Sequence, residues 1–427
     1  MLKRFALTAA ILSCFSICVS AQSTLKQIQE DPMRAAYVYH IYETFGTEQT
    51  AAPEGYSPFY ISHYGRHGSR YATSDSDFKK TLPILQKCHE AGLLTSDGEQ
   101  LLKDITNIAK QHEGMYGILT QLGSVQHQQI SERMFRNFPE VFKQPDRTQV
   151  FAISSPIQRC IQSMANFCTQ LKGNVPTLNF HYYTGDRYLS ILSYNVDWTP
   201  ETKGLPDRVK DELLMEELHT ERLENKTFTD PKAAIKLCEI IPVKFFEAVF
   251  GAAAIAQNLD DKDTPDILTT YFTPKELAVL CEAETVRLYG FWYSSKETGD
   301  YRAKGTGAPI LRDILAKAEE ALDGNDVAAD LRFGHDSGLS PLMSLIKLQN
   351  NDKTLPLARS AKDWKCYREM CMGSNLQMIF YRNAEGTVLV KLLHNEREAT
   401  IEAVPAFKGP YYKWTDLREY FQKILAD

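Results

Sequence analysis

The sequence contains a short segment with the side chains of a phosphate-binding site. Residues 66–70 read RHGSR and place Arg66, His67 and Arg70 around a glycine. A guanidinium group presents fork-shaped donors that match phosphate oxygens, and a neutral imidazole nitrogen can attack phosphorus. The segment therefore predicts an anion-binding loop, although a solvated basic loop would have the same composition.

Two further segments carry groups that could complete such a site. Arg159 follows an apolar run at 149–154, and residues 334–337 (GHDS) bring His335 beside Asp336. An isolated arginine is usually a surface residue, and a single His-Asp pair usually belongs to a turn. The position of all three segments relative to the predicted strands changes that assessment.

Each of the three segments follows a predicted buried strand. Short apolar runs at 59–62, 149–154 and 329–333 have the length and composition of strands in a parallel sheet. The carboxyl ends of parallel strands meet at one edge, where open α/β sheets bind ligands and helix N-termini attract anions. The sequence thus predicts one phosphate pocket assembled from three distant loops.

Helical patterns occupy most of the remaining chain, and 205–297 is helical almost throughout. We expect helices at 75–112 (two), 120–138, 157–170 and 310–322, a hairpin of strands 375–381 and 388–393, and a final helix at 415–425. The predicted fold class is α/β, with a mainly parallel sheet, helices on both faces and a mostly helical cap. Residues 22–170 and 300–427 would form the core, and 171–299 the inserted cap.

Composition and charge exclude several classes of protein. With 43% hydrophobic and 24% charged residues, the chain has the composition of a globular protein, unlike a collagen, a coiled coil or a disordered chain. Its formal net charge of −6 leaves no general basic field for a nucleic acid. An anionic small molecule would have to be bound by a local cluster of positive charge.

The first 21 residues have the pattern of an export signal. Two basic residues precede an apolar stretch at 5–17, and Val-Ser-Ala at 19–21 is typical of a cleavage site. The stretch is shorter than the ~20 residues that span a bilayer, and no later segment is suitable, so we expect a soluble periplasmic or secreted protein. Lipidation of Cys14 or Cys18 would instead anchor it at a surface.

Seven cysteines follow the predicted signal, so at least one must remain a thiol or pair between chains. No CxxC or HExxH motif is present, which removes the strongest zinc signatures. Cys366 and Cys371 could close a short loop, whereas most of the others are interpreted as buried small hydrophobes. A positively charged pocket needs no metal to neutralise phosphate, and we expect neither a metal nor a cofactor.

The three chemical segments are similar to those of a known family. RHGSR resembles the RHGxR signature of the histidine phosphatases, and His335-Asp336 is similar to the second signature of their acid phosphatase and phytase branch. The stretch 155–163 around Arg159 is similar to the arginine motif between those signatures. Four stretches resemble the multiple inositol polyphosphate phosphatases: LTQLG at 119–123, GSNLQ at 373–377, NE at 395–396 and YYKW at 411–414. The resemblance spans about residues 56–425.

The resemblance implies a phosphomonoesterase that works by double displacement. His67 would attack phosphorus and form a phosphohistidine, held in orientation by a backbone carbonyl that accepts from its other ring nitrogen. Asp336 would protonate the leaving oxygen and then help a water molecule attack. Charge on the phosphate oxygens would be stabilised by Arg66, Arg70, Arg159 and His335.

The chain departs from the inositol phosphatase pattern at one important position. That group usually has His-Ala-Glu where this chain has His-Asp-Ser at 335–337. The position that usually carries the glutamate is Ser337 here, and a serine cannot act as the acid. Asp336, one residue earlier and with a shorter side chain, is therefore the candidate acid. The change leaves open which phosphate of a polyphosphorylated ring would be attacked first.

Residues outside the motifs could add substrate contacts. Tyr64 and Thr73 flank the RHGSR loop and are candidate substrate-binding residues. The helical cap is expected to cover the pocket and set substrate size. Its basic residues, such as Arg187, Arg208 and Lys210, could hold outer phosphates, although each is more simply interpreted as part of a solvated helix face.

Three functions remain open at this point. The first is an exported phosphatase that acts on inositol polyphosphates such as phytate, with no nucleic-acid partner and no stable membrane insertion. The second is a broad acid or sugar-phosphate phosphatase with the same mechanism. The third is a non-catalytic protein that binds phosphorylated ligands. The presence of both His67 and Asp336 disfavours the third, because binding alone needs neither a nucleophile nor an acid.

Overall fold

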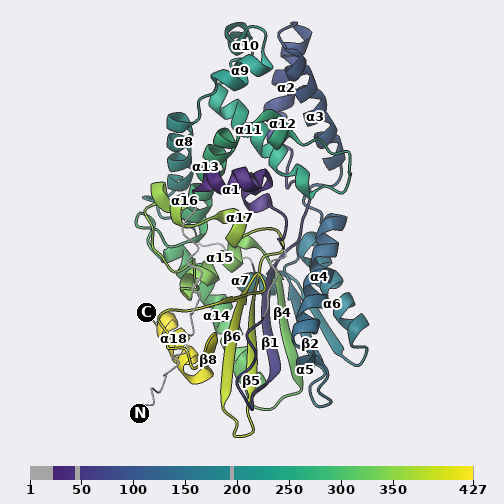
Figure 1. Cartoon of the computed structure of the whole chain (residues 1–427), viewed down its shortest axis with the longest axis vertical. Helices are drawn as coiled ribbons and strands as arrows, with labels where there is room; N and C mark the ends of the chain where they lie inside the picture. The colour runs from purple at the N-terminus through teal and green to yellow at the C-terminus, as the bar shows by residue number, and fades with distance from the viewer. Residues whose placement is uncertain (1–22, 44–48, 193–196, 427) are drawn as a thin grey trace, which may run out of the picture.

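The computed structural model describes residues 23–43, 49–192 and 197–426, and the predicted export signal lies outside them. Figure 1 shows a sheet-containing half below and a helical half above. The predicted α/β class is confirmed by an eight-stranded sheet in the order β3-β2-β4-β1-β5-β6-β7, with β8 paired to β6. The strands are β1 (Ser57–Arg66), β2 (Gln149–Ser154), β3 (Asn179–Thr184), β4 (Val327–Gly334), β5 (Asn375–Arg382), β6 (Val388–His394), β7 (Arg397–Ala399) and β8 (Tyr411–Lys413).

The strands predicted at 59–62, 149–154 and 329–333 are β1, β2 and β4. They are parallel neighbours, so their carboxyl ends share one edge of the sheet. β5 pairs antiparallel to β1 and forms the predicted hairpin with β6. β3 was not predicted, because its sequence NFHYYT is that of a half-exposed edge strand without a continuous apolar run.

The helices make up the rest of the described fold. The α-helices are α1 (Thr24–Glu30), α2 (Ser76–Glu90), α3 (Ser96–His112), α4 (Gln121–Asn137), α5 (Pro139–Phe142), α6 (Gln158–Asn174), α7 (Leu189–Leu192), α8 (Leu205–Glu217), α9 (Glu221–Thr227), α10 (Pro231–Cys238), α11 (Pro242–Ala254), α12 (Ile267–Tyr271), α13 (Pro274–Trp292), α14 (Tyr301–Leu322), α15 (Asp336–Leu345), α16 (Ser360–Asp363), α17 (Cys366–Glu369) and α18 (Trp414–Ala426). Short 3₁₀ helices are η1 (Pro32–Tyr39), η2 (Asp186–Tyr188), η3 (Ala256–Asn258) and η4 (Leu357–Arg359).

Both faces of the sheet are covered by helices. Side chains alternate along a strand, so adjacent residues of β5 enter different apolar clusters: Met378 joins one and Ile379 the other. On the first face Ile310 of α14 packs in the same cluster as Met378. On the second face Phe167 of α6 packs with Ile379. The sheet is therefore buried between two helical layers, which fixes the edge where its loops meet.

The helical half is not confined to the predicted insert at 171–299. In Figure 1, α2 and α3 lie beside α9, α10 and α11, and Phe78 of α2 shares an apolar cluster with Phe246 of α11. Conversely, β3 comes from the predicted insert but lies in the sheet. Periodicity showed that α2 and α3 each have an apolar face, but it did not show which helices that face covers.

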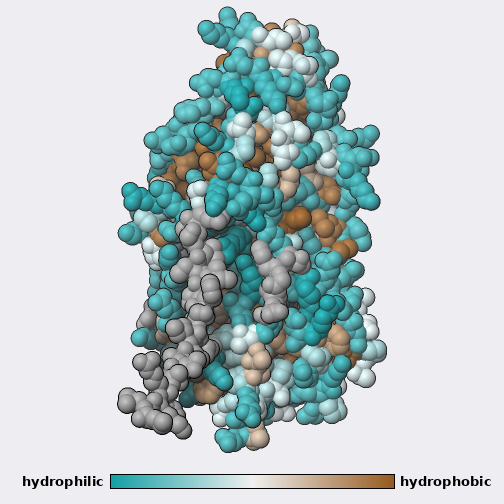
Figure 2. All heavy atoms as spheres, viewed as in Figure 1, coloured by the Kyte–Doolittle hydropathy of each residue, from teal (hydrophilic) through white to brown (hydrophobic). Residues whose placement is uncertain are grey.

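The surface viewed in Figure 2 is mostly hydrophilic, with hydrophobic residues visible chiefly on the helical half. Exposed large hydrophobic side chains include Met215 in α8 and Ile241 before α11. Among the described residues, no helix combines the length and the apolar character needed to cross a bilayer.

Candidate active site

The three chemical segments meet at the carboxyl edge of the sheet. β1 ends at Arg66 and β4 at Gly334, and the amide of His67 donates to the Gly334 carbonyl over 3.1 Å. The amide of Ser155, directly after β2, donates to the carbonyl of Phe333 over 3.1 Å. Because these strands are parallel neighbours, their loops open on the same side and bring the side chains together.

The imidazole of His67 is buried and held in one orientation. Its Nδ1 atom lies 2.9 Å from the carbonyl oxygen of Gly68. A carbonyl only accepts hydrogen bonds, so Nδ1 carries the proton and Nε2 keeps a free lone pair. The predicted support by a backbone carbonyl is confirmed. Burial, and after it the charges of Arg159 and Arg66, hold the pKa of His67 well below its usual value, so the ring is neutral.

The loop that carries His67 is fixed by α4 and α6. The amide of Gly68 donates to Ser163 Oγ over 3.2 Å, and the amide of Ser69 donates to Gln126 Oε1 over 2.8 Å. A side chain at Gly68 would lie 2.6 Å from the carbonyl oxygen of Gly123. The glycine of RHGSR and the glycine of LTQLG are therefore both needed where the two backbones cross.

Arg66 is anchored by several groups at once. Its Nη1 donates to the carbonyls of Val38, over 2.8 Å, and Met370. Its Nη2 lies 2.9 Å from a carboxylate oxygen of Asp336. The side chain is completely buried. These contacts fix the guanidinium plane in advance of any ligand.

Arg70 and Arg159 complete the cluster of positive charge around His67. We refer to Arg66, His67, Arg70, Arg159, His335 and Asp336 together as the phosphate hollow. The guanidinium carbon of Arg70 lies 5.2 Å from the ring centroid of Tyr39, and Nη2 of Arg159 lies 3.4 Å from His335 Nδ1. Among the described residues, the buried Nε groups of Arg66, Arg70 and Arg159 have no hydrogen-bond partner. Buried donors without a partner are rare in proteins, and three around one histidine provide donors for an anion.

His335 faces His67, with 5.6 Å between the ring centroids. Its Nε2 lies 2.9 Å from Ser155 Oγ, and its Nδ1 faces Arg159, which can only donate. The ring proton is therefore on Nε2. Burial, followed by the charge of Arg159, lowers the pKa of His335 to about 4. For the predicted donation to phosphate, a proton must instead occupy Nδ1.

Asp336, the first residue of α15, is a carboxylate in this arrangement. Burial acts to raise the pKa of Asp336, but the positive charge of Arg66, with smaller effects from His335 and Arg70, lowers it below its usual value. The backbone amide of Ser337 also donates to Oδ1 over 2.9 Å. A bound phosphate that neutralises Arg66 would weaken the ion pair and favour the protonated carboxyl group.

The two candidate substrate contacts occupy different environments. Tyr64 is 1% exposed, and its hydroxyl donates to the Leu192 carbonyl over 2.8 Å beneath Gly334. Tyr64 therefore fills the core below the pocket instead of contacting substrate as predicted, because the alternation of β1 points its ring between the strand and α15. Thr73 is exposed in the loop before α2, and its role stays a prediction.

Four residues of this environment were not predicted as site residues. Ser155 and Ser163 bracket the arginine motif, and Gln126 lies one turn beyond LTQLG, so their proximity to recognised motifs was a usable signal. Tyr39 had no such signal. It comes from η1, and only the fold brings its ring against Arg70.

One group of side chains outside the hollow has the composition of a metal site. Asp31, His40 and Glu43 place ligand atoms within 4.8 Å of one another. The Nε of Arg34 lies 3.3 Å from a carboxylate oxygen of Glu43 and 3.8 Å from one of Asp31. This guanidinium group already neutralises both acids, so the cluster is better explained as an ion-pair network.

Comparisons with solved structures show that this fold is shared with other proteins. The chain is similar in fold to the multiple inositol polyphosphate phosphatase of Bifidobacterium longum in complex with inositol hexasulfate, with a TM-score of 0.73, 17% identity, and 91% of this chain and 97% of that one covered. The phytase from D. castellii gives a TM-score of 0.69 at 17% identity, with 93% and 86% covered. The Hafnia alvei phytase gives 0.54 at 13% identity, with 88% and 98% covered. No curated protein matches by sequence.

The sequence profile of the histidine phosphatase superfamily (branch 2) matches residues 65–179 and 237–395, well over half of the chain. The matched ranges include the loop after β1, the arginine of α6 and the His-Asp pair at the start of α15. The chain therefore belongs to branch 2 of the histidine phosphatase superfamily and is a phosphomonoesterase.

Proposed function

We propose that the protein is an exported phosphomonoesterase that hydrolyses inositol polyphosphates through a phosphohistidine on His67. The observation that carries the proposal is the buried hollow around this ring. The unpartnered Nε donors of Arg66, Arg70 and Arg159 surround a neutral imidazole, and Asp336 lies within 2.9 Å of the first of these arginines. A nucleophile, a set of phosphate ligands and an acid are thus in one place.

The first step would transfer the phosphoryl group to the protein. The Nε2 lone pair of His67 attacks phosphorus, the phosphorus–nitrogen bond forms, and the bond to the ester oxygen breaks. Asp336, protonated once phosphate has drawn charge from Arg66, gives its proton to the leaving oxygen. The guanidinium groups stabilise the equatorial oxygens, on which negative charge accumulates.

The second step would return the protein to its starting state. Asp336, now a carboxylate, accepts a proton from a water molecule whose oxygen attacks phosphorus. The phosphorus–nitrogen bond breaks, and inorganic phosphate and the neutral imidazole are released. Because Gly68 holds the proton on Nδ1 throughout, the same nitrogen of His67 serves both steps.

Inositol polyphosphate as the substrate class is supported by two observations. Four stretches of the sequence resemble the inositol polyphosphate phosphatases, and a protein of that name with this fold was captured with inositol hexasulfate. Export is supported by the signal pattern of residues 1–21.

One feature favours a second candidate, a sugar-phosphate or broad acid phosphatase. A cavity of about 620 Å³ borders the site, since Tyr39 lines it and also contacts Arg70. Its lining has one more acidic than basic side chain: four basic residues (Lys80, Lys210, Lys244 and Arg287) and five acidic ones (Asp77, Asp207, Asp211, Glu247 and Glu284). Such a lining suits a hydroxyl-rich group better than a ring crowded with phosphates.

Timed separation of the products from phytate, beside phosphate release from glucose 1-phosphate, tests the proposal. We expect ordered loss of phosphate from phytate with a kcat/KM above that for the sugar phosphate. The reverse preference would support the second candidate. His67→Ala should abolish both activities and the acid-labile phosphoprotein trapped by rapid quenching, and turnover by this variant would contradict the mechanism.

A further inference from the structure

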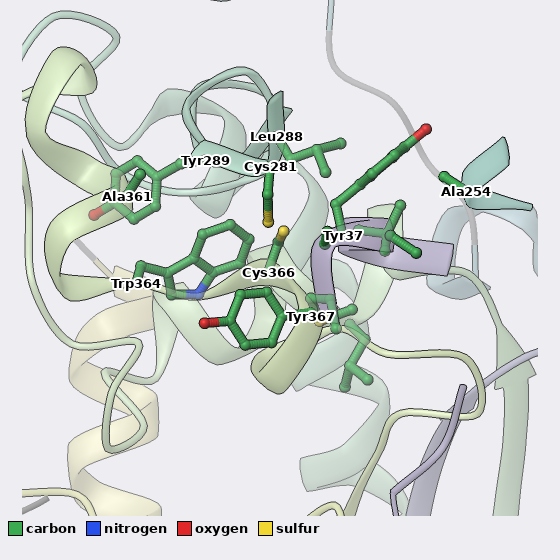
Figure 3. Close-up of a cluster of buried hydrophobic side chains, with 14 of the residues drawn as sticks. Tyr37, Ala254, Cys281, Leu288, Tyr289, Ala361, Trp364, Cys366 and Tyr367 are labelled. Carbon is green, nitrogen blue, oxygen red and sulfur yellow. The ribbon is translucent and has the colours of Figure 1, made fainter. Parts of the chain in front are cut away.

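Two pairs of cysteines lie close together in the tertiary structure although they are distant in sequence. The Sγ atoms of Cys88 in α2 and Cys238 at the end of α10 are 3.7 Å apart. Figure 3 shows the sulfur atoms of Cys281 in α13 and Cys366 in α17 pointing toward each other within a buried cluster. The neighbouring Cys366, together with burial, raises the pKa of the Cys281 thiol. All four residues are thiols in the structure described here.

We propose that Cys88–Cys238 and Cys281–Cys366 are two disulfide sites, closed by exchange with a disulfide of a protein or of a small thiol. A disulfide has a sulfur–sulfur length of about 2.05 Å, so the first pair must approach by less than 2 Å, which side-chain rotation can supply. The proposal is independent of the phosphatase mechanism, because none of the four residues lies in the phosphate hollow.

The other three cysteines have different neighbours. Cys160 donates to the carbonyl of Gly334, and Cys371 lies 3.4 Å from Ser374 Oγ. Cys168 is buried in the apolar cluster between α6 and the sheet. The seven cysteines that follow residue 21 would then form two disulfide pairs and leave three thiols. Pairing of Cys366 with Cys371, which the sequence left open, is disfavoured because Cys366 faces α13.

The exchange step conserves atoms and electrons. A cysteine thiolate attacks one sulfur of the oxidant, forms a mixed disulfide and displaces the first thiol. The partner cysteine then attacks the mixed disulfide, forms the internal sulfur–sulfur bond and displaces the second thiol. The two protein sulfurs lose two electrons, the oxidant gains them, and the two thiol protons of the protein end on the products.

Solvent access separates the two pairs. Cys238 is half-buried, whereas Cys88, Cys281 and Cys366 are fully buried. An external thiol or disulfide can therefore reach the first pair through Cys238 in the folded protein. The second pair offers no accessible sulfur, so it must close during folding and resist reduction afterwards.

The two links would act at different places. Cys88–Cys238 would join α2 to α10, two helices of the helical half that are far apart in sequence. Cys281–Cys366 would join α13 to α17. The residue after α17 is Met370, whose carbonyl accepts a hydrogen bond from Arg66. The second link would therefore tie the helical half to the backbone that supports the phosphate hollow.

Peptide mapping of the full chain tests the pairing directly. The protein is folded in a buffer of oxidised and reduced glutathione, denatured with N-ethylmaleimide and digested. We expect linked peptides for 88–238 and 281–366, and alkylation of Cys160, Cys168 and Cys371. Alkylation of all seven cysteines that follow residue 21, or linkage of other pairs among them, would overturn the proposal. Brief reduction of the folded protein should open only the 88–238 link. Opening of both links at equal rates would contradict the difference in solvent access between the two pairs.

Matched substitutions provide a second measurement. Closing a loop of 150 residues restricts the unfolded chain, so Cys238→Ala should lower Tm by roughly 3–6 °C under oxidising conditions. In reductant the difference from the unsubstituted protein should disappear. For the control Cys168→Ala, any difference in Tm should persist in reductant. A Cys238→Ala deficit that is the same in both buffers would show that no link exists.

Discussion

His67 is a neutral base surrounded by fixed positive charge. An unperturbed histidine, with a pKa of about 6.5, would be mostly protonated at about pH 5 and could not attack phosphorus. Burial and the neighbouring arginines lower the pKa of His67, so those side chains have two effects: they bind phosphate and keep the nucleophile deprotonated. The positive charge of Arg66 lowers the pKa of Asp336 as well, but for a carboxyl group this favours the charged form.

Arg159→Gln tests the electrostatic effect on His67. Removing this charge raises the pKa of His67, so protonation begins at a higher pH and the acidic limb of kcat/KM should move toward neutrality. The loss of a phosphate donor should also lower kcat by roughly 10²-fold. The measurement is the pH profile of kcat/KM with an aryl phosphate from pH 2.5 to 7. Arg187→Gln, at an arginine packed on Tyr188, is the control, and an unshifted limb would contradict the prediction.

Asp336→Asn separates binding from turnover. We expect kcat to fall by about 10²–10⁴-fold, because no acid remains for the leaving oxygen. Inhibition by inorganic phosphate should stay within a few-fold, since Arg66 is released from its ion pair and can still bind an anion. Ser337→Ala should change neither quantity greatly. Retained turnover in Asp336→Asn would remove Asp336 from the acid role.

At the scale of elements, the phosphate loop depends on a backbone crossing between the end of β1 and the start of α4. Thr120 caps α4 by accepting from the Gly123 amide over 3.2 Å, and the Thr120 amide donates to the Ser69 carbonyl over 3.0 Å. The helix is thus bonded directly to the loop that orients His67. The absence of a side chain at Gly123 is a geometric requirement of this contact.

Gly123→Ala should disturb both the fold and the site. The added carbon would lie 2.1 Å from the carbonyl oxygen of Ser69, so the loop or α4 must move. We expect a loss of roughly 2–3 kcal/mol in unfolding free energy, measured in urea, together with a lower kcat. Gly173→Ala is the matched control, because open space surrounds Gly173 near the end of α6, and it should gain up to about 1 kcal/mol. Equal free energies of unfolding for the two variants would show that the backbones do not cross closely at Gly123.

At the scale of the whole molecule, the helical half borders the phosphate hollow with a cavity in which several charged side chains are already paired. Lys210 of α8 contacts Glu247 of α11 and lies 3.6 Å from Glu284 of α13. Lys244 also pairs with Glu247, over 3.0 Å. Lys210, one of the basic side chains predicted to hold outer phosphates, is therefore already committed to contacts that join α8 to α11 and α13.

Lys210→Met distinguishes a structural lysine from one that binds substrate. Burial raises the pKa of Glu284, whereas Arg287 and Lys210 lower it to below its usual value, so loss of Lys210 leaves a less compensated carboxylate. We expect a loss of roughly 1–3 kcal/mol at pH 7 that shrinks toward pH 4.5, where the carboxylates begin to protonate. KM for phytate should change less than twofold. A tenfold rise in KM at unchanged stability would assign Lys210 to the substrate, and the exposed Lys79→Met serves as control.

The sequence by itself determined where the site would form. RHGSR, Arg159 and His335-Asp336 each follow a short apolar run, and parallel strands necessarily present their carboxyl ends together, so one pocket could be predicted without coordinates. The hairpin of β5 and β6 was also predictable, because its two strands and the Glu385-Gly386 turn between them are contiguous in sequence.

Only the tertiary structure decided how the site is tuned. The burial of Tyr64, the contact of Tyr39 with Arg70 and the pairing of Asp336 with Arg66 join residues from different parts of the chain. The pKa of His67 depends on how much water these neighbours exclude and on the positions of their charges. Periodicity shows that a helix or strand has an apolar face, but desolvation and charge separation are set by whatever that face finally packs against.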